Sequence, residues 1–208
     1  MFGPKTLLNP FERYSERTLL IVGMVGIIMG SLIAFAFNGR YDGVVDLHFS
    51  KDVSLAQPFI DNAINVVCLL LPLLLLGKFI NNKTRVIDIL TAILVARIPY
   101  YVLPVFNANN FIGNVTEGIM KQVGESDAPP SLLAQDLNMG PLQTIAVIVF
   151  AIGSIGAMIW MIMILFNGFR TATNLKTIGH KVLFAIALIV AEVLSKIIIL
   201  KMITQTNL

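Results

Sequence analysis

Long runs of apolar residues alternate with shorter polar segments along the chain, a pattern typical of helices that cross a membrane. A hydrocarbon core of about 30 Å is crossed by about 20 helical residues, each rising about 1.5 Å. Five runs have about this length and few or no charges. They predict an all-α fold, a polytopic membrane helical bundle forming one domain over residues 1–208, with transmembrane helices at residues 19–37, 59–80, 87–106, 142–166 and 182–203.

Two of these runs carry charges and need an energetic argument. Arg97 lies in the middle of the third run, where its cost of about 2.5–3.5 kcal/mol nearly cancels the gain from the surrounding apolar residues. The third run is therefore expected to insert with help from neighbouring helices. The fifth run contains Glu192 and Lys196, but its larger apolar content favours insertion, and Lys196 is close enough to one end to reach the interface.

The composition supports a membrane protein and excludes several other classes. Hydrophobic residues make up 56% of the chain and charged residues only 13%, about half of their share in soluble domains. A net charge of +3 gives no concentrated basic patch, so a nucleic-acid partner is not expected, and the apolar content excludes a disordered chain. The single Cys68 lies in an apolar run, which excludes a disulfide framework or a cysteine-rich metal site.

Lysine and arginine are distributed unevenly between the two sets of loops. Nine lie in the N-terminal segment and in the loops after the second and fourth spans, whereas four lie on the other side. The positive-inside rule therefore predicts a cytoplasmic N-terminus and an external C-terminus. The nine are Lys5, Arg13, Arg17, Lys78, Lys83, Arg85, Arg170, Lys176 and Lys181, and the four are Arg40, Lys51, Lys121 and Lys201.

The segments outside the spans have local patterns of their own. Asn9, followed by Pro10 and Glu12, predicts the start of a short N-terminal interfacial helix. In the first outer loop, a turn followed by period-two alternation over residues 45–49 predicts a short strand, and the second outer loop contains a possible helix near residues 115–123. The acidic residues and histidine of the first loop follow no known ligand spacing, so no metal site is expected.

Charged residues within lipid are candidates for function, and three are present: Arg97, Glu192 and Lys196. Arg97 and Glu192 each lie about 15 Å from the start of their span, which predicts that they pair side by side in the bundle interior. Lys196 lies one helical turn beyond Glu192 on the same face. This intramembrane polar cluster can hold the bundle together, line a path for a substrate or ion, or form another regulated site.

Small residues and prolines mark the expected packing surfaces and one irregular helix. Glycine, alanine and serine at a spacing of four let helix backbones approach closely. The expected helix-packing positions are Gly26, Gly30, Gly153, Ala157, Ala187, Ala191 and Ser195. Pro99 and Pro104 free backbone carbonyls close to Arg97, which predicts a kink or a break in the third span.

Motifs that would indicate catalysis are absent from the sequence. It contains no nucleophile elbow, no zinc-protease motif and no phosphate-binding loop, and the only histidines, His48 and His180, fall on opposite predicted sides of the membrane. No catalytic residue and no cofactor are therefore expected, and the chain is predicted not to be an enzyme.

The chain resembles the Yip-one (Ypt-interacting protein) domain family in a form like its bacterial members. The resemblance rests on five spans with the N-terminus inside, on the lead-in at residues 9–13, and on Trp160, Leu165, Gly168 and Arg170 before a basic loop. It implies a multi-pass protein without established chemistry, located in the bacterial cytoplasmic membrane. Eukaryotic relatives contact small GTPases through a longer N-terminal region, whereas about 18 residues precede the first span here, which argues against GTPase binding.

Two functional interpretations follow from the sequence. The first is a non-enzymatic membrane protein that acts through contacts with membrane lipids, with other membrane proteins or with itself, in membrane organisation or a trafficking-like role. The alternative is a small transporter or channel subunit with a polar path at Arg97, Glu192 and Lys196. A dry, packed interior would favour the first interpretation, and a water-filled cavity at the midplane would favour the alternative.

Overall fold

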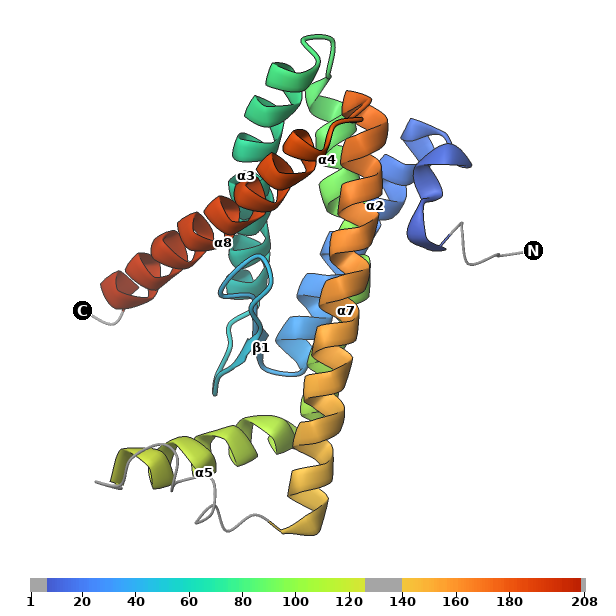
Figure 1. Ribbon diagram of the computed structural model, residues 1–208. Coiled ribbons are helices and arrows are strands. Elements are labelled where there is room, and N and C mark those ends of the chain that lie inside the picture. The colour runs from blue at the N-terminus through green and yellow to red at the C-terminus, as the bar shows by residue number, and fades with distance from the viewer. Residues whose placement is uncertain (1–6, 126–139, 207–208) are drawn as a thin grey trace.

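The protein is a bundle of five long apolar helical segments, as the sequence predicts (Figure 1). The computed structural model describes residues 7–125 and 140–206, and the side chains of residues 7–121 and 140–202. The helices extend beyond most predicted boundaries because polar caps and lead-ins continue the helical backbone past the apolar runs. The four unbroken helices are α2 (Glu16–Ala36), α3 (Ala56–Ile80), α7 (Pro141–Thr173) and α8 (Ile178–Thr206).

The third span is broken, as its prolines predict. The helix α4 (Val86–Ala96) ends just before Arg97, and the chain continues as the 3-10 helix η2 (Ile98–Asn110). Pro99 occupies the first turn of η2, and Pro104 lies inside it. After a non-helical stretch at residues 107–109, the amphipathic helix α5 (Phe111–Glu125) runs across the end of the bundle rather than along it (Figure 1). This helix covers the segment near residues 115–123 for which a helix is predicted.

The loop between α2 and α3 folds back into the bundle, which the sequence analysis did not anticipate. Strand β1 (Gly39–Arg40) pairs antiparallel with β2 (His48–Phe49), and we call residues 39–49 the re-entrant hairpin. The predicted strand over residues 45–49 is thus reduced to two residues. The reason is that Tyr41 and Val44 are buried in the core, at 0% and 2% exposure, instead of alternating along a surface strand.

The N-terminal segment forms a short helical turn, η1 (Pro10–Glu12), at the position where the sequence predicts a short helix. It is fixed to α7 by two side chains that donate hydrogen bonds to its backbone. The Trp160 Nε1 lies 3.0 Å from the Leu7 carbonyl oxygen, and the Asn167 Nδ2 lies 2.9 Å from that of Leu8. We call the end of the bundle where η1 lies the η1 end, and the opposite end, where α5 lies, the α5 end (Figure 1).

Glycines on α2 allow it to contact the broken span at very short distance. A Cβ atom at Gly26 would lie 2.8 Å from the side chain of Ile98, and one at Gly30 would lie 2.3 Å from the ring of Tyr101. Both glycines therefore lie at the helix-packing surface of α2. The contact of Gly153 on α7 is looser, with a Cβ position 3.4 Å from the ring of Phe106.

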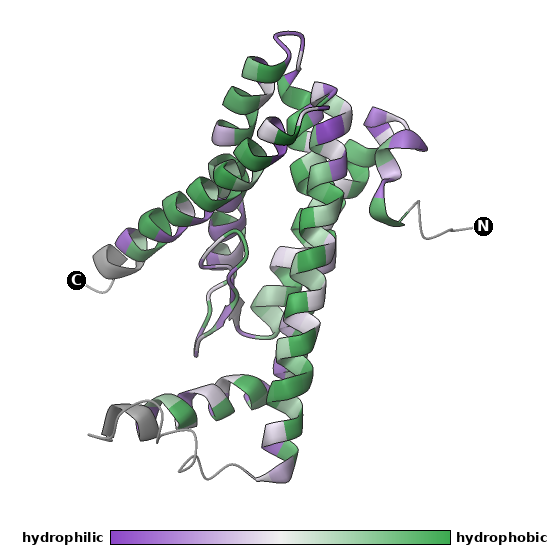
Figure 2. Ribbon diagram, in the orientation of Figure 1, coloured by the Kyte–Doolittle hydropathy of each residue, from purple (hydrophilic) through white to green (hydrophobic). Residues whose placement is uncertain are grey.

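The outer surface of the bundle is apolar over most of its length. Figure 2 shows hydrophobic residues covering α7 and α8, whereas hydrophilic residues gather on the re-entrant hairpin and in the loops. Exposed isoleucine and valine side chains follow the outer faces of α2, α7 and α8. A surface of this kind is stable in lipid rather than in water. The chain is thus an integral, multi-pass membrane protein by the length and composition of its helices.

Candidate functional site

Arg97 lies at the centre of the bundle, in the break between α4 and η2, and only 1% of it is exposed. Each of the three guanidinium nitrogens donates a hydrogen bond within the protein. Nε donates to the Tyr101 hydroxyl at 3.2 Å, Nη1 to the Val44 carbonyl at 2.9 Å and Nη2 to Oδ1 of Asn62 at 3.1 Å. The guanidinium also lies within 5.8 Å of the ring centres of Tyr41 and Tyr101, a favourable placement for a cation.

Glu192, on α8, binds the hairpin backbone next to the carbonyl that Arg97 binds. Its Oε2 accepts a hydrogen bond of 3.0 Å from the backbone N–H of Val45. The Val44 carbonyl and the Val45 N–H belong to one peptide group, so Arg97 and Glu192 bind opposite sides of a single peptide. Negative charge on Glu192 strengthens its bond to the N–H as positive charge on Arg97 strengthens its bond to the carbonyl.

The prediction that Arg97 and Glu192 pair directly is wrong. Among the described residues, Glu192 forms its ion pair with Lys196, at 3.5 Å, and no ion pair joins Glu192 to Arg97. The two predicted partners do reach the same depth, but the re-entrant hairpin occupies the space between them. The structure therefore brings Glu192 and Lys196 together and links Arg97 to them through the Val44–Val45 peptide.

We call Arg97, Glu192 and the groups that they bind on the hairpin, η2 and α3 the polar centre. Lys196 lies at its edge rather than inside it. Its ammonium group is 2.8 Å from Asp46 of the hairpin, and the two side chains are 51% and 45% exposed. The Asp46 carboxylate is thus a partner that sequence reasoning did not assign to it. This ion pair fixes the outer side of the hairpin tip to α8.

Three polar residues of α3 anchor the rest of the hairpin, and the sequence analysis missed all three. Asp61 accepts two hydrogen bonds from Arg40, at 2.9 and 2.7 Å, while Asn62 binds Arg97 and Asn65 donates to the Tyr41 carbonyl at 2.9 Å. The available signal was the presence of two amides beside Asp61 at the start of a span that continues as an uninterrupted apolar run over residues 66–76. Buried amides require partners, so they indicate that polar backbone enters the bundle.

Small residues on α8 let this helix approach the amides of α3. Ala187, Ala191 and Ser195 are buried, and the Ser195 Oγ donates a hydrogen bond of 2.7 Å to Oδ1 of Asn65. The expected packing stripe of α8 thus faces α3 and contributes to the polar centre. On α7, Ala157 packs against the edge of the hydrophobic core.

Asp42 is the polar group of the hairpin that is least well satisfied. Its Oδ1 atom is buried and has no hydrogen-bond partner within the described part of the chain. Burial raises the pKa of the Asp42 carboxyl above its usual value, although His48 and Arg40 partly offset this effect. The folded hairpin therefore holds the proton of Asp42 more tightly than the unfolded chain does.

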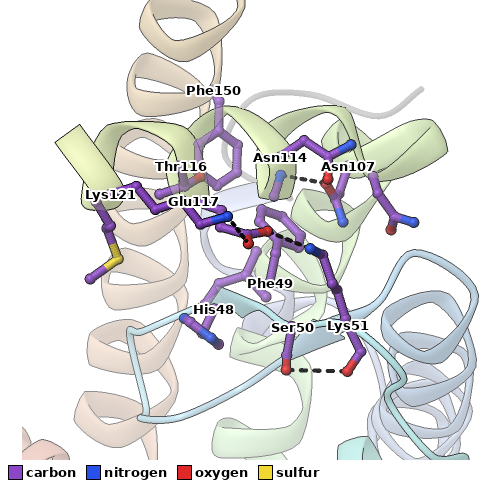
Figure 3. A pocket seen from close by; sticks show the side chains of 14 residues that line it. His48, Phe49, Ser50, Lys51, Asn107, Asn114, Thr116, Glu117, Lys121 and Phe150 are labelled. Atoms are coloured by element: carbon purple, nitrogen blue, oxygen red, sulfur yellow. Dashed lines mark hydrogen bonds and ion pairs between the residues drawn. The ribbon is translucent and has the colours of Figure 1, made fainter. Parts of the chain in front are cut away.

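A separate cavity of about 570 Å³ opens at the α5 end (Figure 3). Phe49 of the hairpin and Lys51, which follows it, form one wall, Glu117 and Lys121 of α5 form another, and Phe150 of α7 contributes its ring. Figure 3 shows the two lysines directed at the Glu117 carboxylate, with nitrogen–oxygen distances of 2.6 Å for Lys51 and 2.9 Å for Lys121. The cavity lies beyond the polar centre and shares with it only the hairpin.

The described residues contain no group of three or more histidine, cysteine, aspartate or glutamate side chains that could hold a metal ion. The polar centre supplies hydrogen bonds and ion pairs, and their described partners are backbone and side-chain groups of the protein itself. Neither a protein-family model, nor a curated protein, nor a solved structure matches this chain.

Proposed function

We propose that this protein is a non-enzymatic, Yip-type membrane protein that acts through contacts with lipid or with other membrane proteins. In this proposal the polar centre is a scaffold that holds the re-entrant hairpin at the α5 end. The proposal treats Arg97, Glu192 and Lys196 as structural residues. The function then resides in the surfaces that the scaffold positions.

The observation that carries this proposal is that every guanidinium nitrogen of Arg97 is bonded to a group of the protein. Its guanidinium is 1% exposed and donates from all three nitrogens to groups of the protein. A cation that binds a passing substrate needs donors that are free or that exchange readily with water. The closed arrangement around Arg97 instead supports a structural role, in which Arg97 joins η2, α3 and the hairpin.

Two residues quoted for the family resemblance lie against the N-terminal lead-in. Trp160 donates to the Leu7 carbonyl, and a Cβ atom at Gly168 would lie 2.8 Å from the ring of Phe11. The lead-in and the end of α7 therefore form one contiguous contact. This contact supports the Yip-type assignment because it gives the two separated motifs a common structural role.

A transport path is the alternative, and the broken third span favours it. Interrupted helices with irregular backbone at membrane depth occur at the substrate sites of transporters. Here the break lies at Arg97, beside a hairpin that enters from the α5 end. In this case the hairpin would have to leave its place to open a path.

Reconstitution into vesicles distinguishes the two functions. Purified protein in vesicles is expected to leave proton and potassium permeability at the level of protein-free vesicles. Protein extracted from native membranes in mild detergent and analysed by mass spectrometry is expected to retain specific lipids or a membrane protein. A flux that depends on the protein and is abolished by Arg97→Lys would overturn the proposed function in favour of transport.

A further inference from the structure

The cavity at the α5 end combines an aromatic floor with a charged rim. The rings of Phe49 and Phe150 lie 5.6 Å apart between centres, and Leu47 and Met120 extend the apolar lining. On the rim, Lys51 and Lys121 both contact the Glu117 carboxylate (Figure 3). A volume of about 570 Å³ lies within the range of sites that bind small molecules.

The three charges of the rim do not cancel. Two ammonium groups share one carboxylate, which leaves an excess of one positive charge above an apolar floor. The lysine side chains are 69% and 68% exposed, so both ammonium groups can contact a ligand without breaking buried contacts. The arrangement is suited to an anion that carries an apolar part.

The position of the cavity restricts the source of such an anion. Helix α5 follows the third span directly, is amphipathic and lies across the end of the bundle (Figure 1). Its buried residues Ile112 and Val115 face the protein, whereas Glu117 and Lys121 lie at the rim. A helix with these properties lies at the boundary between hydrocarbon and headgroups, where lipid phosphates are concentrated.

We propose that this cavity binds the phosphate group of an anionic phospholipid, with the phosphate between Lys51 and Lys121 and the first part of the acyl chains over Phe49 and Phe150. The phosphate oxygens accept hydrogen bonds from the two ammonium groups, in competition with the Glu117 carboxylate that pairs with both lysines. The inference rests on the proposed function in naming lipid as the contact. It adds the class of lipid and the residues that recognise it.

The test measures the thermal stability of the full chain in a neutral detergent with added lipid. Phosphatidylglycerol is expected to raise the melting temperature in a concentration-dependent way, whereas phosphatidylcholine has a much smaller effect. The variant with both Lys51→Gln and Lys121→Gln is expected to need at least about ten times more phosphatidylglycerol for the same stabilisation. Lys83→Gln, an exposed lysine in the loop at the η1 end, is the matched control and should behave like the wild type.

Glu117→Gln separates binding from structural support. This variant removes both ion pairs but raises the net charge of the rim, so it is expected to bind phosphatidylglycerol more tightly, by about three- to tenfold. If the ion pairs only stabilise α5, Glu117→Gln will bind no better than the wild type, and this result would overturn the proposal. Equal stabilisation by phosphatidylcholine, or equal loss in Lys83→Gln, would also overturn it.

Inorganic phosphate identifies the source of the anion. It is expected to compete with phosphatidylglycerol only at millimolar concentration, because it lacks the apolar part that covers the aromatic floor. Competition at the concentration of the lipid itself would overturn the lipid assignment and identify a free phosphate ligand. If the protein shows no preference for phosphatidylglycerol and produces no vesicle flux, only the proposed lipid site is refuted. If it prefers phosphatidylglycerol but produces a flux, only the proposed function is refuted.

Discussion

The contributions of Arg97 and Glu192 to the free energy of unfolding can be measured separately, because one peptide group lies between the two side chains. Replacing Arg97 with leucine leaves the Val44 carbonyl and the Asn62 amide oxygen buried without their donor. Each such group costs about 1–3 kcal/mol, so the free energy of unfolding is expected to fall by about 2–6 kcal/mol. Glu192→Gln keeps an oxygen that can accept from Val45 and is expected to cost less than Glu192→Leu. Unfolding by a denaturing detergent in mixed micelles measures these differences.

The double variant tests whether the two charges depend on each other. When Arg97 is removed, Glu192 keeps both Val45 and Lys196 as partners, so no buried charge is left alone. The effects of Arg97→Leu and Glu192→Leu are therefore expected to add except for a coupling of about 1 kcal/mol through the peptide that both side chains bind, a size common inside membrane bundles. A coupling of about 3 kcal/mol or more would indicate a direct ion pair that the structure does not contain.

Asp42 makes the stability of the hairpin dependent on pH. Burial raises the pKa of its carboxyl, so the folded state holds this proton more tightly than the unfolded state. Its contribution is complete below the unfolded pKa of about 3.9 and is lost as the pH rises through the folded value. Asp42→Asn is expected to melt at a higher temperature than the wild type at neutral pH. The difference should disappear near pH 4, and a constant difference at all pH values would contradict this explanation.

At the scale of elements, the contact between α2 and η2 depends on the absence of a side chain. A Cβ atom at Gly30 would lie 2.3 Å from the ring of Tyr101, which is itself buried and holds Arg97. Gly30→Ala is expected to lower the free energy of unfolding by about 1–3 kcal/mol, because neither backbone can move without breaking other contacts. Circular dichroism during detergent unfolding gives the measurement.

Gly156 on α7 provides the matched control, since no atom outside its helix lies within 4 Å of its Cβ position. Alanine is a better helix former than glycine, so Gly156→Ala is expected to be neutral or to stabilise the protein by up to about 1 kcal/mol. If both alanine variants lose the same stability, the cost belongs to the helix backbone and not to the contact with Tyr101.

For the whole molecule, five spans and the distribution of cations predict ends on opposite sides of the membrane. Reporter domains fused at Thr6 and Leu208 are expected to show the N-terminus in the cytoplasm and the C-terminus outside. This arrangement places the α5 end, with its cavity, on the outer side. Reporters on the same side would mean that one of the five helices does not cross.

The sequence predicts the long helices well, but it predicts the interior poorly. Runs of apolar residues specify spans because the thickness of the membrane is fixed, and Pro99 specifies the break in the third span. The re-entrant hairpin has no such signal, since its burial depends on Asn62 and Asn65, which lie on another element. Long-range partners of this kind satisfy polar groups across the fold, and local periodicity does not report them. The cavity was missed for the same reason, because the hairpin segment, η2, α5 and α7 all contribute to its lining.

The peptide between Val44 and Val45 has a consequence for spectroscopy. A cation at its carbonyl and an anion at its N–H both favour the resonance form with a weaker carbonyl bond and a stronger C–N bond. A carbon-13 label at the Val44 carbonyl should therefore absorb at a lower infrared frequency than a label in a helix. The Val45 amide proton should resonate far downfield and exchange with deuterium as slowly as protons of the helices, although it belongs to a loop.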